Sequence, residues 1–196
     1  MFVKICGLKK QLEVNICKEY GAKFIGFVFY NQSSRNISVL DVSRLKFPQK
    51  LKSVAVTVDA DRALIDEILN SNRFDFLQLH GNETAGECIE LKKLYPNVGI
   101  IKAISDLKLI AEYEEVVDFL LLDSCTAGSG EAFDWGVLDG IKIKVPFFLA
   151  GGVNISNIQK TLQYTKYTDI SSGVEGIRGV KDIQKMADLL RFASVL

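Results

Sequence analysis

The sequence predicts an α/β fold, a compact (β/α)8 barrel whose eight parallel strands close into one sheet. Short segments rich in β-branched and aromatic residues alternate with amphipathic segments, and the alternation repeats eight times. Strict alternation of strands and helices implies parallel strands joined by right-handed crossovers. The chain has 196 residues, whereas this fold typically needs ~250. We therefore expect short helices, few insertions and a single domain spanning residues 1–196.

The predicted strands are short apolar runs bounded by turn-forming residues. In order, they cover residues 2–6, 24–29, 53–58, 76–80, 99–104, 119–123, 147–150 and 168–172. The rival fold is an open, doubly wound sheet, which usually carries a glycine fingerprint after its first strand. The first strand here leads only into Cys6-Gly7, without GxGxxG, and this favours the barrel.

Helical segments lie between these strands and carry signals at their ends. They include residues 8–20, 59–71, 82–95, 106–116 and 154–164. Thr84 and Glu87 have the spacing of a capping box. Asp61 and Asp106 can each cap a helix start, and Gly21 is placed to follow the end of the first helix.

Composition excludes several classes of function. The 24 basic and 24 acidic residues balance, so there is no electrostatic footprint for nucleic acid or an anionic membrane. No segment approaches the ~20 apolar residues of a membrane span. Lys4, Lys9 and Lys10 stand where a signal peptide would need its apolar core, so we expect a cytoplasmic protein.

The cysteines and the single histidine argue against a zinc site. Cys6, Cys17, Cys88 and Cys125 lie far apart without a CxxC pair, and His80 is the only histidine. Without a secretion signal, the thiols are expected to be free.

Alternate residues of a barrel strand point into the barrel. If Cys6 points inward, so does Lys4, and Val3 and Ile5 face the helices. The other side chains expected inside are Ala55, Thr57, Gln78, His80, Lys102, Phe119, Leu121, Asp123, Asp169 and Ser171, with Val54, Val56 and Val58 outside. Polar residues inside a barrel form either a buried ion network or a site.

Height along the strand separates these two alternatives. Cys6, His80, Asp123 and Asp169 end their strands, where barrel enzymes carry catalytic groups. Lys4 and Lys102 lie farther from the C-terminal ends of their strands, below this rim. We expect a lysine to pair with Asp169.

Asp123 is the clearest candidate for chemistry. It ends the buried run of residues 119–122 and precedes a small, flexible loop at residues 127–130. A carboxylate in this position suits a catalytic acid under a mobile or tightly wrapped lid. The alternative is an Asp that caps the next turn.

Two glycine-containing loops near the C-terminus predict a phosphate site. Gly151-Gly152 ends one strand and a helix is expected to open near Asn154, while Ser171-Ser172-Gly173 ends the next strand. Glycines let backbone N–H groups approach an anion, and a helix start adds donors and a favourable dipole. In barrels, the loops after strands seven and eight commonly bind phosphate. A glycine pair alone is more often a turn.

Together, these segments resemble the phosphoribosylanthranilate isomerase family of tryptophan biosynthesis. The resemblance is carried by VKICGL (3–8), GFVFYNQSSRNIS (26–38), LQLHG (77–81), LLLDS (120–124), GSGEAFDW (128–135), FLAGGV (148–153), DISSGVEG (169–176) and GVKD (179–182). It implies a (β/α)8 barrel that performs an Amadori rearrangement without a metal or organic cofactor. It also implies a small-molecule phosphoribosyl substrate, with no nucleic acid or membrane partner, and a monomer or homodimer.

The resemblance also implies roles for individual residues. Cys6 would be the general base and Asp123 the general acid, and Arg35 would hold the anthranilate carboxylate. The phosphate cradle would be Gly151, Gly152, Ser172 and Gly173. Asp169 is placed among the substrate-binding residues, and His80 either lines the cavity or satisfies backbone groups.

Cys6 and Arg35 each have a simpler interpretation. A cysteine is often just a small buried hydrophobe. To act as a base, the Cys6 thiol would need its pKa lowered from ~8.5 by a nearby cation or by backbone donors, and Lys4 is the candidate. An isolated loop arginine such as Arg35 is usually solvated surface, although a guanidinium can bind a carboxylate bidentately.

Two other functions compete with this one. The related isomerase of histidine biosynthesis performs the same rearrangement on a substrate with two phosphates and uses a carboxylate as base. Cys6 in that place and one clear phosphate cradle favour the anthranilate substrate. A barrel that binds a phosphosugar without catalysis would be expected to lack Cys6 or Asp123, and both are present.

Overall fold

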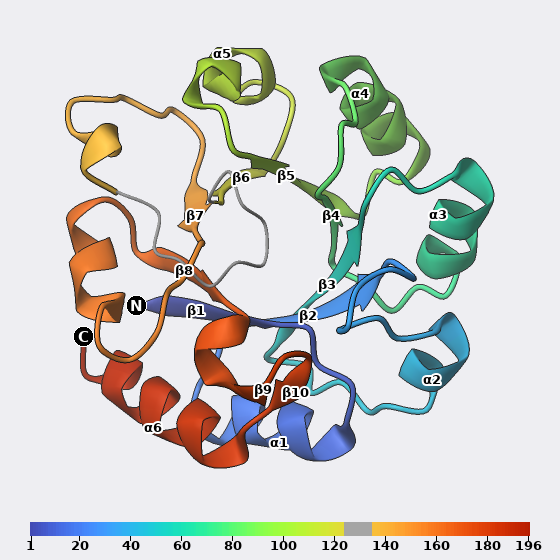
Figure 1. Ribbon diagram of the computed structural model, residues 1–196. Coiled ribbons are helices and arrows are strands. Elements are labelled where there is room, and N and C mark those ends of the chain that lie inside the picture. The colour runs from blue at the N-terminus through green and yellow to red at the C-terminus, as the bar shows by residue number, and fades with distance from the viewer. Residues whose placement is uncertain (124–134) are drawn as a thin grey trace.

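The computed structural model describes residues 1–123 and 135–196 as a closed barrel of eight parallel strands in the order β1 to β8 (Figure 1). The strands are β1 (Phe2–Cys6), β2 (Phe24–Phe29), β3 (Lys52–Thr57), β4 (Phe76–Leu79), β5 (Gly99–Ile104), β6 (Phe119–Leu122), β7 (Phe147–Leu149) and β8 (Tyr167–Ile170). Each pairs with its sequence neighbour, and β1 pairs with β8 to close the sheet. The predicted barrel is confirmed, with strand ends shifted by at most two residues.

The outer layer consists of short helices. These are α1 (Gln11–Glu19), α2 (Val39–Ser43), α3 (Arg62–Leu69), α4 (Ala85–Leu94), α5 (Ile110–Tyr113) and α6 (Ile183–Ser194), with 3-10 helices η1 (Leu107–Leu109), η2 (Trp135–Leu138), η3 (Ile158–Gln163) and η4 (Ser172–Val174). A two-stranded antiparallel hairpin, β9 (Glu175–Ile177) and β10 (Val180–Lys181), follows β8. Within the described residues, no helix is long and apolar enough to span a membrane.

The predicted helix ends are largely confirmed. Thr84 and Glu87 form a reciprocal capping box at α4, and the Asp61 carboxylate accepts from Leu64 N at the start of α3. Gly21 follows α1 with a φ of 81°, which a residue with a Cβ rarely adopts. Asp106, however, caps only the 3-10 turn η1, and residues 154–164 contain only the 3-10 helix η3 instead of an α-helix.

Strand register corrects part of the predicted inside and outside pattern. Side chains at paired positions of neighbouring strands point the same way, and Cys6 pairs with Gly26, which pairs with Val54. Val54 therefore faces inward with Cys6, together with Val56, and Val58 lines the cavity. The prediction for this strand was wrong. It placed the small and polar residues Ala55 and Thr57 inside the barrel, whereas in the structure these two side chains face the helices.

Lys102 is the second correction. Its neighbours Ile101 and Ala103 pack inside the barrel, so its own side chain faces outward. There its Nζ lies 2.9 Å from Glu83 Oε2 and over the Tyr113 ring. The other assignments hold: Lys4, Cys6, Gln78, His80, Phe119, Leu121, Asp123, Asp169 and Ser171 face the interior, and Val3 and Ile5 face the helices.

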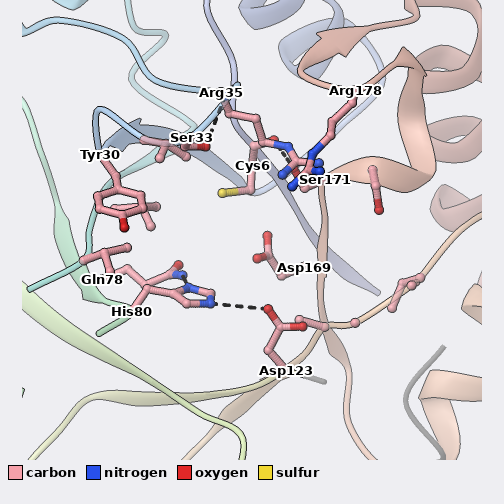
Figure 2. A pocket seen from close by; sticks show the side chains of 18 of the residues that line it. Cys6, Tyr30, Ser33, Arg35, Gln78, His80, Asp123, Asp169, Ser171 and Arg178 are labelled. Carbon is pink, nitrogen blue, oxygen red and sulfur yellow. Dashed lines mark hydrogen bonds and ion pairs between the residues drawn. The ribbon is translucent and has the colours of Figure 1, made fainter. Parts of the chain in front are cut away.

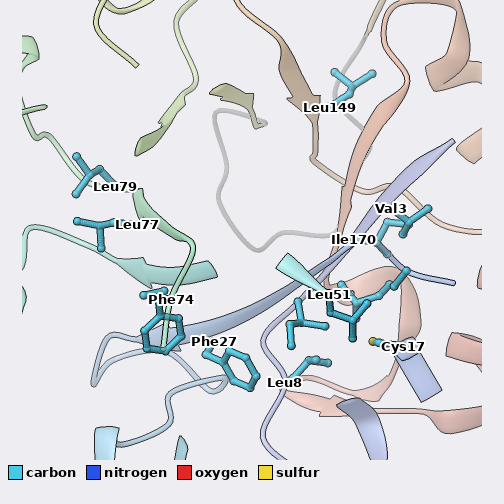
Figure 3. Close-up of a cluster of buried hydrophobic side chains, with 14 of the residues drawn as sticks. Val3, Leu8, Cys17, Phe27, Leu51, Phe74, Leu77, Leu79, Leu149 and Ile170 are labelled. Atoms are coloured by element: carbon cyan, nitrogen blue, oxygen red, sulfur yellow. The ribbon is translucent and has the colours of Figure 1, made fainter. Parts of the chain in front are cut away.

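Two apolar layers hold the barrel and direct the cavity to one end. Between strands and helices, a continuous cluster includes Phe27 and Phe74 on one side and Val3 and Ile170 on the other (Figure 3). Inside the barrel, toward the N-terminal ends of the strands, aromatic rings fill the section with centroids 5.1 to 6.5 Å apart; they are Phe2, Phe24, Phe76, Phe119, Phe148 and Tyr167. This packing leaves the C-terminal ends of the strands for the site.

Candidate active site

A cavity of about 330 Å³ opens at the C-terminal ends of the strands. Eight of the nine predicted site residues line it: Cys6, Arg35, His80, Asp123, Gly151, Gly152, Asp169 and Ser172. Figure 2 shows Cys6 and Arg35 on one side, His80 and Asp123 on the other, and Asp169 between them. The ninth, Gly173, is not among the lining residues. A Cβ there would lie 2.0 Å from Val153 O, so Gly173 lets η4 pack against the loop after β7.

The thiol of Cys6 is buried at the end of β1, beside an ion pair. Lys4 Nζ donates to Asp169 Oδ1 at 3.0 Å, which confirms the predicted lysine partner. Gly26 makes room for the thiol, because a Cβ at that position would lie 3.0 Å from Cys6 Sγ.

The pKa of the Cys6 thiol is raised, which is the opposite of what the role of general base would require. Burial is the largest cause, the charge of Lys4 opposes it, Asp169 adds to it, and Lys181 opposes it. Lys4 does act in the predicted direction, but its charge is shared with Asp169. Desolvation of the thiolate therefore outweighs the nearby cations.

Asp123 lies on the wall of the cavity opposite Cys6, next to a pair of contacting polar side chains, His80 and Gln78 (Figure 2). Its Oδ2 lies 3.3 Å from His80 Nε2, and Gln78 Nε2 lies 2.7 Å from His80 Nδ1. The Gln78 amide and the Asp123 carboxyl therefore flank the two ring nitrogens of His80 and fix the orientation of the imidazole between them. Of the two alternatives for His80, the side chain lines the cavity.

Arg35 is held in place before any ligand arrives. It lies on the loop after β2, where its backbone N–H donates to Ser33 Oγ at 3.1 Å. Its Nε and Nη2 donate to Glu175 Oε1 and Oε2 at 2.7 and 2.9 Å. A guanidinium has five N–H groups, so three remain for another partner. Gly7 is required beside it, because its φ is 80° and a Cβ there would lie 2.8 Å from Arg35 Cδ.

The glycine loops after β7 and β8 lie side by side at the rim. Gly151 and Gly152 have φ values of 75° and 72°, which favour glycine. The expected helix start near Asn154 is absent; Asn154 and Asn157 instead donate their side-chain amides to Gly152 O, each at 3.1 Å. Any anion held here therefore depends on the glycine loops and nearby side chains, without the dipole of an α-helix.

Three charged residues of the hairpin were missed by sequence reasoning. Arg178, in the turn between β9 and β10, is exposed and lines the cavity. Glu175 and Lys181 reach inward from β9 and β10 and are buried. The segment GVEGIRGVKD has no helical or alternating apolar pattern; Glu175 and Lys181 fall inside the motifs DISSGVEG and GVKD that carry the resemblance, but nothing in those motifs assigned either residue a role.

Two further predictions concern metals and the sixth loop. In the described ranges 1–123 and 135–196, no three His, Cys, Asp or Glu side chains are grouped so that they could hold a metal ion. The predicted loop at 127–130 and Cys125 lie outside the described residues.

A closed parallel barrel with a thiol, carboxylates and glycine loops at its C-terminal rim is typical of a TIM-barrel enzyme that acts on a phosphorylated substrate. Residues 3–191 match the family model described as "N-(5'phosphoribosyl)anthranilate (PRA) isomerase". The N-(5'-phosphoribosyl)anthranilate isomerase of Rhizobium meliloti is 40% identical over 200 residues, which cover 94% of this chain and 93% of that protein. That of Rhodopseudomonas palustris (strain TIE-1) is 36% identical over 207 residues, with 97% of each covered.

Solved structures agree. The phosphoribosyl anthranilate isomerases of Thermotoga maritima and Thermus thermophilus superpose with TM-scores of 0.87 and 0.86 at 29% and 27% identity, each over 100% of both chains. The chain belongs to the N-(5'-phosphoribosyl)anthranilate isomerase family. It is an isomerase of tryptophan biosynthesis, which confirms the predicted resemblance and decides against both the histidine-pathway substrate and a non-catalytic barrel.

Proposed function

We propose that Cys6 and Asp123 divide the proton transfers of the Amadori rearrangement between them. Asp123, as general acid, protonates the ring oxygen of the phosphoribosyl group, the bond from that oxygen to C1 breaks, and a Schiff base forms. Cys6, as general base, then removes the proton from C2, and the resulting enolamine tautomerises to the ketone. The observation that carries this proposal is that the thiol and the carboxyl line the same cavity from opposite walls (Figure 2).

The proposed roles need help from neighbouring residues. His80 orients the Asp123 carboxyl through the contact of 3.3 Å. Cys6 must lose its proton before it can act, and burial opposes that loss. Only a small fraction of resting enzyme therefore carries the thiolate at neutral pH, and that fraction grows as the pH rises.

Substrate binding is proposed to use cations and backbone groups at the rim. The free N–H groups of Arg35 hold the anthranilate carboxylate. Gly151, Gly152 and Ser172, which line the cavity, form the phosphate cradle together with the backbone of the adjoining Gly173, and the exposed guanidinium of Arg178 adds a charge beside it. Asp169, whose Oδ1 is held by Lys4, accepts from a substrate hydroxyl through its other oxygen. A relative of known structure, 28% identical with a TM-score of 0.84, was solved with reduced 1-(o-carboxyphenylamino)-1-deoxyribulose 5-phosphate.

The acid and base assignments are tested together with freshly generated phosphoribosylanthranilate, whose fluorescence disappears on isomerisation. Wild type, Cys6→Ser and Asp123→Asn are compared at equal concentration. We expect wild type to consume the substrate quickly and each variant to lose ~10²- to 10⁴-fold in kcat. A folded Cys6→Ser or Asp123→Asn variant with wild-type kcat would remove that residue from the mechanism.

The remaining features of the protein follow from charge balance and family. We infer that residues 1–196 act as one domain in the cytoplasm on a small phosphoribosyl substrate, without nucleic acid or membrane partners. The balance of 24 basic and 24 acidic residues supports this inference. The chain is proposed to be a monomer or homodimer, and the isomerase of Thermotoga maritima is described as dimeric. Light scattering of the purified protein distinguishes the two states.

A further inference from the structure

We infer that Glu175 is a positioning residue for the isomerisation: it fixes the Arg35 guanidinium in the orientation that receives the substrate carboxylate. The inference rests on the role proposed for Arg35. Glu175 belongs to the β9–β10 hairpin, 140 residues from Arg35 in sequence, and its side chain is 4% exposed. Nothing in the catalytic steps requires this carboxylate to touch the substrate.

Both oxygens of Glu175 are saturated with donors. Oε1 accepts from Arg35 Nε at 2.7 Å and from Lys181 Nζ at 2.9 Å. Oε2 accepts from Arg35 Nη2 at 2.9 Å and from Gly179 N at 3.0 Å. Four donors on one buried carboxylate leave it a single orientation, and the guanidinium bound to it is fixed in turn.

The geometry leaves Arg35 one edge for a ligand. Glu175 occupies the edge formed by Nε and Nη2, so the end formed by Nη1 and the second Nη2 hydrogen stays available. A carboxylate can bind two N–H groups of that end in parallel. Because the side chain is ordered before binding, the substrate does not have to immobilise it, and affinity rises accordingly.

Glu175 is also connected to the loop after β8 through Lys181. Lys181 Nζ donates to Ser171 O at 2.8 Å and contacts Ser171 Oγ at 3.2 Å. Ser171 Oγ in turn donates to Cys6 O at 3.1 Å. One carboxylate thus links the proposed carboxylate site, the loop that leads into Ser172 and Gly173, and the end of the strand that carries the thiol.

Simple electrostatics predicts the opposite result from positioning, which makes the inference testable. The substrate carries a carboxylate and a phosphate, and a buried negative charge beside the site repels both. If Glu175 acted only through its charge, Glu175→Gln would strengthen substrate binding. If Glu175 orients Arg35, the same substitution weakens binding, because the amide group places donors opposite the donors of Arg35 and Lys181.

The experiment compares two ligands in four proteins. The ligands are the reduced product analogue with its aryl carboxylate and the same analogue without it; the proteins are wild type, Glu175→Gln, Arg35→Ala and the double variant. Binding is measured by calorimetry, and kcat and KM by fluorescence. For Glu175→Gln we expect KM and the Kd of the carboxylate analogue to rise roughly tenfold, with a smaller change for the other analogue and in kcat. In the double variant, Glu175→Gln should change the Kd of the carboxylate analogue little beyond the effect of Arg35→Ala alone.

A matched control removes another charged hydrogen-bond acceptor far from the site. Asp75 lies just before β4 at the opposite end of the barrel and accepts from Lys52 Nζ, Ser53 N and Ser53 Oγ. Asp75→Asn should leave the KM and both Kd values unchanged. If Glu175→Gln does not fold, Glu175→Asp keeps the charge but shortens the side chain, and it should show the same preference for loss of carboxylate binding.

The outcomes separate this inference from the proposed function. If Arg35→Ala leaves the preference for the carboxylate analogue intact, the role of Arg35 in the proposed function is wrong. If Arg35→Ala abolishes that preference but Glu175→Gln leaves it unchanged, or strengthens binding, only the positioning role is overturned. An equal loss for both analogues would also overturn it, since a general structural defect does not distinguish them.

Discussion

The buried carboxylate of Glu175 should make stability depend strongly on pH in the acid range. The donors around it lower its pKa from 4.5 to about 2, against the opposing effect of burial. A carboxyl group whose pKa is lower in the folded state contributes stability above the pKa of the unfolded chain, and the contribution is lost as the pH falls through the folded pKa. Lowering this pKa from 4.5 to about 2 corresponds to roughly 3 kcal/mol of stability at neutral pH.

The loss can be followed quantitatively. Protonation of the unfolded chain should remove about 1 kcal/mol of this contribution by pH 4 and about 2 kcal/mol by pH 3. Urea unfolding of wild type and Glu175→Gln, each at several pH values from 7 downward, isolates this one group, because the other titrations cancel in the difference between the two proteins. Trp135, the only tryptophan, is buried and provides the fluorescence signal.

A control and a refuting result follow from the same titration. Far-UV circular dichroism must give the same midpoints as Trp135 fluorescence, since otherwise unfolding is not two-state and the free energies are not comparable. Wild type should be the more stable protein at pH 7, with its advantage shrinking toward pH 3. An advantage that stays constant over this range would mean that the charge of Glu175 is not held by Arg35 and Lys181 as described.

Three further predictions concern activity. Cys6→Ala should lower kcat by orders of magnitude with little change in KM, because it removes a group that acts in the transition state; a large change in KM alone would assign Cys6 to binding. Since burial raises the pKa of the Cys6 thiol and the charges facing it are those of Lys4, Asp169, Lys181 and Arg35, wild-type kcat/KM should rise toward alkaline pH. Lys181→Met should move that rise to higher pH, as measured by initial rates across the range, whereas an unmoved profile would show that Lys181 does not stabilise the thiolate. Arg178→Ala should weaken inhibition by inorganic phosphate several-fold in the fluorescence assay; unchanged inhibition would place phosphate elsewhere.

The barrel was predictable because its signals are local. Eight short apolar runs, the capping box of Thr84 and Glu87, and the glycine after α1 each depend on neighbouring residues only. Register between strands depends on distant residues, and there the prediction failed: Val54 and Lys102 were assigned to the wrong faces. Both errors came from assigning polar residues to the interior of the barrel. In the structure, valines fill the interior, and Lys102 forms an ion pair with Glu83 outside it.

The site residues likewise divide into those that local sequence signals predict and those that depend on contacts between distant residues. Cys6, His80 and Asp123 lie at or directly after the ends of their strands, so a period of two and the barrel geometry place them at one rim without knowledge of contacts. Asp169 points into the same cavity from one position before the end of β8, level with Lys4. Glu175 could not be found this way. It comes from a hairpin without an apolar pattern, and its importance depends on a contact with a residue 140 positions earlier.

Burial is the main reason that the pKa of the Cys6 thiol is raised, and the ion pairs around the thiol limit how far the nearby cations can oppose it. Lys4 is neutralised by Asp169, and Lys181 by Glu175, so neither cation gives its whole charge to Cys6. An unpaired lysine at either place would stabilise the thiolate more, but it would leave a buried charge without a partner. Both pairs also involve residues of the proposed mechanism, since Asp169 faces the cavity and Glu175 is the residue proposed to orient Arg35. If those roles are right, the carboxylates that organise substrate binding also reduce the acidity of the proposed base, and an alkaline rise in kcat/KM is the expected kinetic consequence.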